Sequence, residues 1–166
     1  MTELKSSQIR YEGVFDWPQL YSAMHGWFSE RKYDYHETKH VRKPGTYGHE
    51  LEFEIKAERE ETPYVKYNVD ITMKAYHVED VEIITEGKKQ QKTKTGMLII
   101  NIKPSIELDW KKKWATKFEK KAHEFFTKYI IKKQIEQWKE ELQYETHKLQ
   151  TKIKEELNLE HSYLAH

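Results

Sequence analysis

Histidine is the residue type with the widest chemical scope here, and the chain has nine histidines. His36 and His40 are four residues apart, a spacing that would let two imidazoles share a metal ion on a helix. The residues around them predict a strand instead, on which these side chains would stand about 13 Å apart. His25, His49 and His77 have no carboxylate or second histidine at a metal-binding spacing. The sequence therefore predicts neither a metal site nor a bound cofactor.

A row of carboxylates, Glu50, Glu52 and Glu54, is the next candidate, because paired carboxylates can divide the roles of general acid and base. Their alternation with apolar residues instead indicates the solvent face of a strand. No serine lies in a nucleophile elbow, the six glycines form no phosphate-binding loop, and the chain has no cysteine. We therefore assign no catalytic residue, and the sequence leans away from an enzyme.

Two lysine clusters could contact phosphate groups. One lies in an expected hairpin loop at residues 86–95, and the other opens the C-terminal helix. They would form a single patch if the loop folded toward the helix start. Neither cluster contains aromatic residues that stack on bases, and a net charge of +1 gives no general attraction to nucleic acid. The patch consists of Lys88, Lys89, Lys92, Lys94, Lys111, Lys112 and Lys113.

Length and composition indicate one domain spanning residues 1–166. No apolar run reaches the length of about 18 residues needed to cross a membrane. Residues 1–7 lack the apolar core of a signal peptide and are expected to form a loose arm. We expect a cytoplasmic protein. Its high content of Lys and Glu is typical of thermophiles.

The hydropathy pattern predicts an α+β domain with an antiparallel sheet of about five to six strands, in the order β-α-β-β-β-β-α. After a strand at residues 8–15, Asp16 is suited to cap a helix whose first turn contains Pro18. The later strands are expected to include a kink or bulge at His77. On the strand at 33–42, we expect a shared face for Tyr33, Tyr35 and Val41.

The C-terminal segment has no Gly or Pro from Asp109 to Asn158, which predicts helix throughout. Such a helix would be about 73 Å long, whereas a compact domain is only about 30–40 Å across. Its apolar stripe also rotates near residue 130, so the helix should kink or change the face that it presents. We therefore expect the sheet core to comprise residues 8–130, followed by a distal helix at 131–158 and a tail at 159–166.

The distal helix carries apolar residues at a spacing that resembles a coiled-coil seam. Two alternatives follow: this face packs back on the same domain, or it recruits a second copy or a helix of another protein. The predicted partner-helix face consists of Ile131, Ile135, Trp138, Leu142, Leu149 and Ile153.

Residues 8–135 resemble the START-like, helix-grip superfamily, which includes the polyketide cyclases and plant pathogenesis-related proteins. The resemblance rests on the element order, on Asp16-Trp17-Pro18 after the first strand, and on the aromatic-rich start of the final helix. It implies an apolar cavity between sheet and helix that holds a hydrophobic ligand, although bulky aromatics could instead fill this space. The residues implied to line it are Phe53, Tyr67, Ile71, Ile100, Phe118, Phe125 and Tyr129.

These observations predict a non-catalytic binding domain for a hydrophobic small molecule or lipid. The first alternative is a protein interaction module that uses the distal helix to form a homodimer or to bind a helical partner. The second is contact with phosphate or RNA through the lysine patch.

Overall fold

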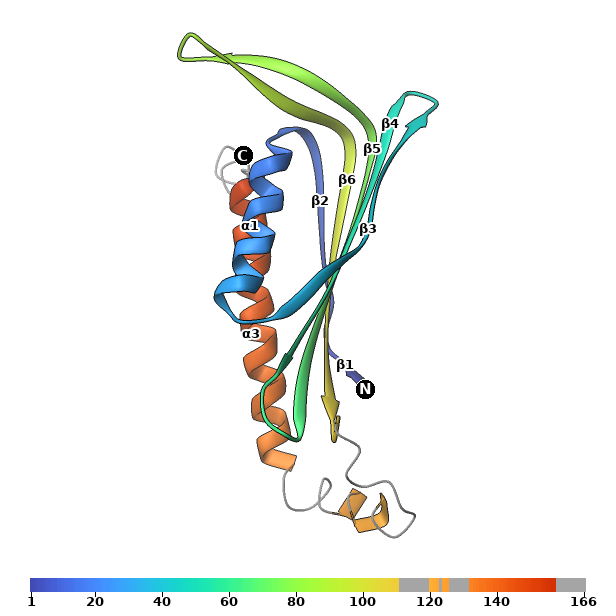
Figure 1. Ribbon diagram of the computed structural model, residues 1–166, viewed down its shortest axis with the longest axis vertical. Helices are drawn as coiled ribbons and strands as arrows, with labels where there is room; N and C mark the ends of the chain where they lie inside the picture. Colours follow the sequence, from blue (N-terminus) through green and yellow to red (C-terminus); the bar gives the residue numbers. More distant parts are fainter. Residues whose placement is uncertain (111–119, 123, 126–131, 158–166) are drawn as a thin grey trace.

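The computed structural model describes residues 1–110, 120–122, 124–125 and 132–157 and has an α+β fold (Figure 1). Six strands form one antiparallel sheet, and two long helices lie side by side on one of its faces. Residues 120–122 and 124–125 are also helical. The main elements are β1 (Thr2–Glu3), β2 (Ser7–Phe15), α1 (Trp17–Glu30), β3 (Asp34–Gly45), β4 (Gly48–Glu60), β5 (Val65–Thr85), β6 (Lys88–Leu108) and α3 (Lys132–Glu156).

The strand order is β1-β6-β5-β4-β3, and β2 also pairs with β6. β1 and β2 occupy different stretches of the same side of β6, because Thr2 pairs with Ile106 whereas Ser7 pairs with Ile102. Residues 1–7, expected to be a loose arm, therefore contain a short strand. A sheet that wraps around a C-terminal helix is a helix-grip-like arrangement, as the element order predicted.

α1 begins where the sequence predicts. The Asp16 side chain accepts a hydrogen bond from the Gln19 backbone N–H at 3.1 Å, and Pro18 stands in the first turn. This cap satisfies one of the N–H groups that a helix leaves unpaired at its start. The buried face of α1 carries Leu20, Met24, Trp27 and Phe28. The cap and the apolar stripe together fix both the start of the helix and the side that faces the core.

The C-terminal helix corrects two expectations. It does not begin at Asp109, whose N–H bonds the Tyr64 carbonyl at 2.7 Å and closes the end of the β5–β6 ladder. α3 begins at Lys132, and its inner face is buried against the sheet and α1 (Figure 1). The predicted change of face near residue 130 lies outside the described residues. The buried residues of this helix and the turn after it are Ile135, Leu142, Thr146, Leu149, Ile153 and Leu157.

The distal segment is thus a helix that the sheet grips, and most of the proximal segment, which we expected to pack on the sheet, lies outside the described residues. The elongated sheet gives this segment a long surface to pack on. β5 and β6 each have 21 residues, or about 70 Å of strand, so an α3 of 25 residues and about 38 Å fits along them. Among the helices that the structure describes, none has the length and apolar character needed to cross a membrane.

A crease crosses the sheet at the predicted irregularity of β5. His77 has a φ of 55°, and Gly13 and Gly48 on β2 and β4 have φ values of 133° and 118°. The pairing of β2 with β6 and of β4 with β5 shifts register at this level. The His77 ring also lies so close to Gly96 that a Cβ there would meet Nδ1 at 2.8 Å. Conformations that favour glycine therefore bend several strands at one level.

Beyond the crease, β5 and β6 continue as a two-stranded arm that curves over the ends of the helices (Figure 1). The loop predicted at residues 86–95 is wrong, because only Glu86 and Gly87 form the turn, with φ values of 54° and 77°. Positive φ at both turn residues is typical of a two-residue hairpin. The following residues lack an apolar pattern because most of them are exposed, and backbone pairing with β5 holds them in the strand.

Candidate functional site

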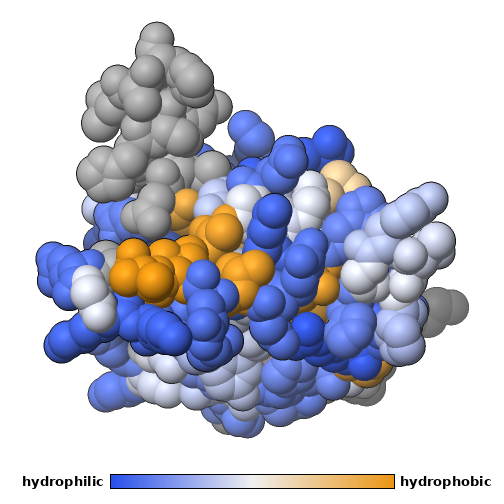
Figure 2. Space-filling view, turned by 90° about the horizontal axis from the view of Figure 1, so that it is seen from above, coloured by the Kyte–Doolittle hydropathy of each residue, from blue (hydrophilic) through white to orange (hydrophobic). Residues whose placement is uncertain are grey.

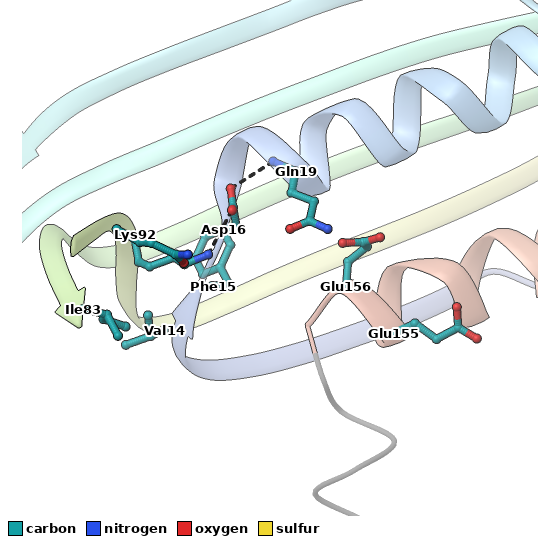
Figure 3. Close-up of a pocket in the computed structure, with 9 residues that line it drawn as sticks. Val14, Phe15, Asp16, Gln19, Ile83, Lys92, Glu155 and Glu156 are labelled. Atoms are coloured by element: carbon teal, nitrogen blue, oxygen red, sulfur yellow. Dashed lines mark hydrogen bonds and ion pairs between the residues drawn. The ribbon is translucent and has the colours of Figure 1, made fainter. Parts of the chain in front are cut away.

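The arm covers a hollow of about 510 Å³ at one end of the molecule (Figure 3). Its walls are the end of β2, the first turn of α1, the last turn of α3 and the inner face of the arm. The lining residues are Val14, Phe15, Asp16, Gln19, Ile83, Gln90, Lys92, Glu155 and Glu156. The bend of the arm brings these residues together, because they come from segments that are far apart in the sequence.

The apolar part of the hollow is formed by Val14, Phe15 and Ile83. Phe15 is buried in the core, whereas Val14 and Ile83 are half-buried and lie close together in Figure 3. Seen from this end, the surface shows an apolar patch surrounded by hydrophilic residues (Figure 2). On the arm, Ile84 is 69% exposed. This end of the molecule thus offers apolar contact area that the fold itself leaves partly uncovered.

The polar wall next to this apolar part is an ion pair. Lys92 on β6 donates to Asp16 Oδ2 at 3.0 Å, while the other carboxylate oxygen of Asp16 caps α1. Burial alone would raise the pKa of Asp16, but the hydrogen bonds from Lys92 and the Gln19 N–H outweigh it and lower this pKa. Lys92 therefore ties the arm to the start of α1 and has its charge matched within the wall.

The opposite wall carries Glu155 and Glu156 from the last turn of α3 (Figure 3). With Asp16, they place three carboxylates beside the single ammonium of Lys92, which leaves a formal charge of −2 around the hollow. The C-terminal end of a helix also carries partial negative charge from its carbonyl groups. The arrangement suits a molecule with an apolar body and a positive group.

A second cluster joins α1 to β3 and surrounds the Glu37 carboxylate. The Tyr21 hydroxyl donates to Glu37 Oε1, His25 Nε2 lies 3.0 Å from the same oxygen, and His40 Nδ1 lies 3.5 Å from Oε2. The hydrogen bond from Tyr21 is the main cause that lowers the pKa of Glu37, and the same bond raises the pKa of Tyr21. The cluster fastens α1 to the edge strand.

A bulge explains why the sequence did not predict this cluster. Residues 37 and 40 would face opposite sides of a regular strand, but the pairing of β3 with β4 shifts between Glu37 and Lys39. The extra residue turns Glu37 and His40 to the same side. It also makes the predicted shared face wrong, because Tyr33 is buried and Tyr35 is half-buried whereas Val41 is 42% exposed.

A third polar group holds α3 at the other end of α1. Arg59 donates to Glu145 Oε1 at 3.1 Å and to the Arg31 carbonyl at 3.1 Å, and its guanidinium lies 4.6 Å from the centre of the Tyr33 ring. Tyr33 donates to Glu145 at 3.0 Å. Burial, followed by the charge of Glu145, raises the pKa of Tyr33. These contacts are satisfied within the chain, so we assign them to fixing the register of α3.

The predicted cavity residues do not line the hollow. Phe53, Tyr67, Ile71 and Ile100 are each at most 1% exposed and belong to the packed core. Phe125 is 60% exposed, and Phe118 and Tyr129 lie outside the described residues. The bulky side chains between sheet and helix therefore pack against their neighbours, which agrees with the alternative of a filled space.

The predicted partner-helix face is also occupied. Ile135, Leu142, Leu149 and Ile153 are buried in this chain, Trp138 is half-buried, and Ile131 lies outside the described residues. Of the two alternatives, the structure shows the one in which the distal helix packs on its own domain. The apolar residues of this face pack against the sheet and α1. They therefore do not form an exposed face for a helical partner.

The structure describes only the part of the lysine patch that lies on β6. Lys88, Lys89 and Lys94 are exposed on the arm, and Lys92 is paired with Asp16. Lys111, Lys112 and Lys113 lie outside the described residues, but Trp110 just before them is at the opposite end of β6 from Lys88. The hairpin does not fold toward residue 109, which was the condition for a single patch, because the segment after the turn runs as a strand.

The predicted solvent face of β4 is confirmed. Lys43 lies 3.7 Å from Glu50 and 3.6 Å from Glu52, and Thr38 donates to Glu54 at 2.8 Å. Within the described residues, no three side chains of histidine, aspartate or glutamate are arranged to hold a metal ion.

The fold thus defines an α+β domain with a helix-grip-like arrangement and an arm that overhangs the gripped helix. No protein-family model, curated protein or solved structure matches this chain.

Proposed function

We propose that this protein is a non-catalytic binding domain for a small molecule that combines an apolar body with a positively charged group. The observation that carries the proposal is the hollow of about 510 Å³ under the arm, with apolar residues on one side and, on the other, two carboxylates that form no ion pair with the described residues. Ligand sites usually have volumes of about 300–1,000 Å³ and combine apolar walls with a few polar groups.

The charge around the hollow supports a cationic group on the ligand. The Lys92 ammonium already has a carboxylate partner at 3.0 Å, so an anionic ligand would have to compete with Asp16. Glu155 and Glu156 have no ion pair with another described residue and line a ligand-sized space. An ammonium group beside them would gain two favourable charge interactions, each worth about 0.2–1 kcal/mol at an exposed site.

The proposed site differs from the one that the helix-grip resemblance implies. Between the sheet and α3 the side chains are packed, whereas the space under the arm is open to solvent. A hydrophobic ligand in this chain would therefore bind at the end of the gripped helix, with its apolar part against Val14, Phe15 and Ile83.

Three probes of equal chain length separate charge from apolar contact: n-octylamine, n-octanol and n-octanoate. We expect octylamine to bind most tightly and octanoate most weakly when titrated into the intact chain at pH 7 and followed by NMR. Replacing both Glu155 and Glu156 with Gln should weaken octylamine binding by up to about thirtyfold and leave octanol unchanged.

The arm supplies its own matched control. Ile83 faces the hollow, whereas neighbouring Ile84 points to the other side of the arm. Ile83→Ser should weaken all probes that bind, and Ile84→Ser should leave them unchanged. The proposal fails if octanoate binds as well as octylamine, or if both isoleucine variants have the same effect.

A further inference from the structure

The face of the sheet opposite the two long helices carries a second hollow, of about 220 Å³. It lies beyond the reach of the site under the arm, on the other side of the sheet and toward its other end. Its lining is mainly polar and comes from the N-terminal segment and four strands: Met1, His36, Lys56, Ala57, Glu58, Asn68, Asp70 and Ser105.

Cross-strand pairing places the polar residues of this hollow in two adjacent rows. Lys56 on β4 is opposite Asp70 on β5, and His36 on β3 is opposite Lys56. In the next row, Asn68 on β5 is opposite Ser105 on β6. Residues 68 and 70 share one face of β5 because strand side chains alternate. The sheet therefore holds this set of side chains on rigid elements.

Two of these side chains have no partner for their polar atoms in the described part of the chain. The Asn68 amide nitrogen is buried and donates no hydrogen bond. The half-buried Asp70 carboxylate makes no hydrogen bond or ion pair with the described residues, although Lys56 and Lys103 flank it on the neighbouring strands. Both lysines are exposed and extend to solvent.

The buried Asn68 amide nitrogen costs free energy in the folded state. A buried polar group without a hydrogen bond destabilises a protein by about 1–3 kcal/mol, and native structures contain few of them. Here an unused donor and an unused acceptor stand two residues apart on one strand face, and both line the same hollow. A molecule that offers an acceptor to Asn68 and a donor to Asp70 would satisfy both.

We propose that this hollow binds a small zwitterion of the size of an α-amino acid. The ammonium group of the ligand lies against the Asp70 carboxylate, and its carboxylate accepts from the Asn68 amide. Glu58, which is opposite Asn68 on β4, is already paired with Lys66 at 3.0 Å. Ser105 and His36 supply further polar contacts at the wall. The site is independent of the one under the arm.

The test uses the intact chain and the free amino acids as probes, first as a mixture and then singly. n-Butylamine and n-butyrate carry only one of the two charges, and glycerol carries neither. Binding is followed by NMR through the Asn68 side-chain amide and the backbone signals of β5. We expect saturation by at least one amino acid below about 10 mM and no saturation by the three comparison probes.

Asp70→Asn is the diagnostic variant, and Asp80→Asn, an exposed carboxylate on the same strand, is its control. Asp70→Asn removes an unpaired charge, so it should fold at least as stably as the parent chain and weaken amino-acid binding at least tenfold. Asp80→Asn should leave binding unchanged. The absence of saturation by every amino acid, which would mean that the hollow holds only water, overturns the proposal. Equal affinity of the two variants also overturns it.

Discussion

The Lys92 ammonium on β6 lies 3.0 Å from Asp16 Oδ2, at the first turn of α1. The two residues are separated by 76 positions in the sequence. One carboxylate thereby caps a helix with one oxygen and holds the overhanging arm with the other. This contact connects Asp16, the residue that caps α1, to the arm that lies above the hollow.

Variants of Asp16 separate these two roles. Asp16→Ala should lower the free energy of unfolding by about 1 kcal/mol, because the cap is lost. Asp16→Asn keeps an oxygen that can cap the helix but removes the negative charge that pairs with Lys92. Its free energy of unfolding at pH 7 should therefore fall by less than that of Asp16→Ala. Urea unfolding followed by tryptophan fluorescence measures both.

The stability difference between the parent chain and Asp16→Asn should also depend on pH. The pKa of Asp16 is lower in the folded state than in the unfolded state, so its stabilisation is complete above the unfolded value of about 4. This contribution disappears as the pH falls through the folded pKa. The stability difference between the parent chain and Asp16→Asn should therefore shrink below about pH 4. A difference that stays constant down to pH 2.5 would contradict the assignment.

Two glycine substitutions test the crease. A Cβ at Gly96 would meet His77 Nδ1 at 2.8 Å and its Cβ at 3.0 Å, whereas a Cβ at Gly26 on α1 meets nothing within 4 Å. Gly96→Ala should destabilise by about 1–3 kcal/mol through this crowding. Gly26→Ala should stabilise by about 0.5–1 kcal/mol, since alanine favours the helix.

The pair is informative because the chemical change is the same at both positions. Thermal unfolding should show shifts of opposite sign for the two variants. The double variant Gly96→Ala with His77→Gly should recover stability, because it removes the crowding side chain and leaves glycine at a φ of 55°. A Gly96→Ala variant as stable as the parent chain would argue against close packing at the crease.

Glu37→Gln tests the cluster between α1 and β3. Glutamine removes the charge that accepts from Tyr21 and His25, so the free energy of unfolding at pH 7 should fall by about 1 kcal/mol. The lowered pKa of Glu37 means that this contribution is complete above the unfolded value and is lost as the pH falls through the folded one.

An NMR titration of the tyrosine ring carbons gives a second measure of the same cluster. The pKa of Tyr21 is raised mainly by its hydrogen bond to Glu37, so it should fall toward the ordinary tyrosine value in Glu37→Gln. Tyr33 belongs to the separate Arg59 group, and its pKa should stay raised. Equal shifts of both tyrosines would indicate a general loosening of the fold.

Substitutions on α3 test which of its faces packs on the sheet. Leu149 is fully buried in the core, and Tyr144 is 62% exposed on the same helix. Leu149→Ala should lower the free energy of unfolding by about 2–5 kcal/mol because it leaves a cavity. Tyr144→Ala should lower it by about 0.5 kcal/mol or less. Chemical unfolding of both variants makes the comparison. Similar small losses would show that the seam is not the packed face.

Local patterns predicted much of the fold. The cap at Asp16 and the apolar stripe from Leu20 to Phe28 predicted α1, and strict alternation in residues 51–57 predicted the buried face of β4. These predictions succeed because each depends on neighbours only a few residues apart. The arm was missed for the complementary reason: residues 88–95 have no apolar pattern, and the pairing partner that makes them a strand is on β5.

The candidate site could not be predicted from residue types alone. Val14, Ile83 and Glu156 have unremarkable local contexts, and the hollow exists only because the crease bends the arm over the two helices. The cluster around Glu37 likewise depends on a bulge, and no hydropathy pattern marks the single extra residue that turns His40 to the same side.

The sequence by itself determined the α+β class, the order of the long elements, the start of α1 and the irregularity at His77, because backbone preferences and hydropathy period set these locally. Tertiary structure alone decided that the distal part of the C-terminal segment packs on the sheet. Two parts of that segment carry apolar stripes, and the length of β5 and β6 determines where a returning helix can lie. The same long-range geometry joins Lys92 to Asp16 and creates the hollow beneath the arm.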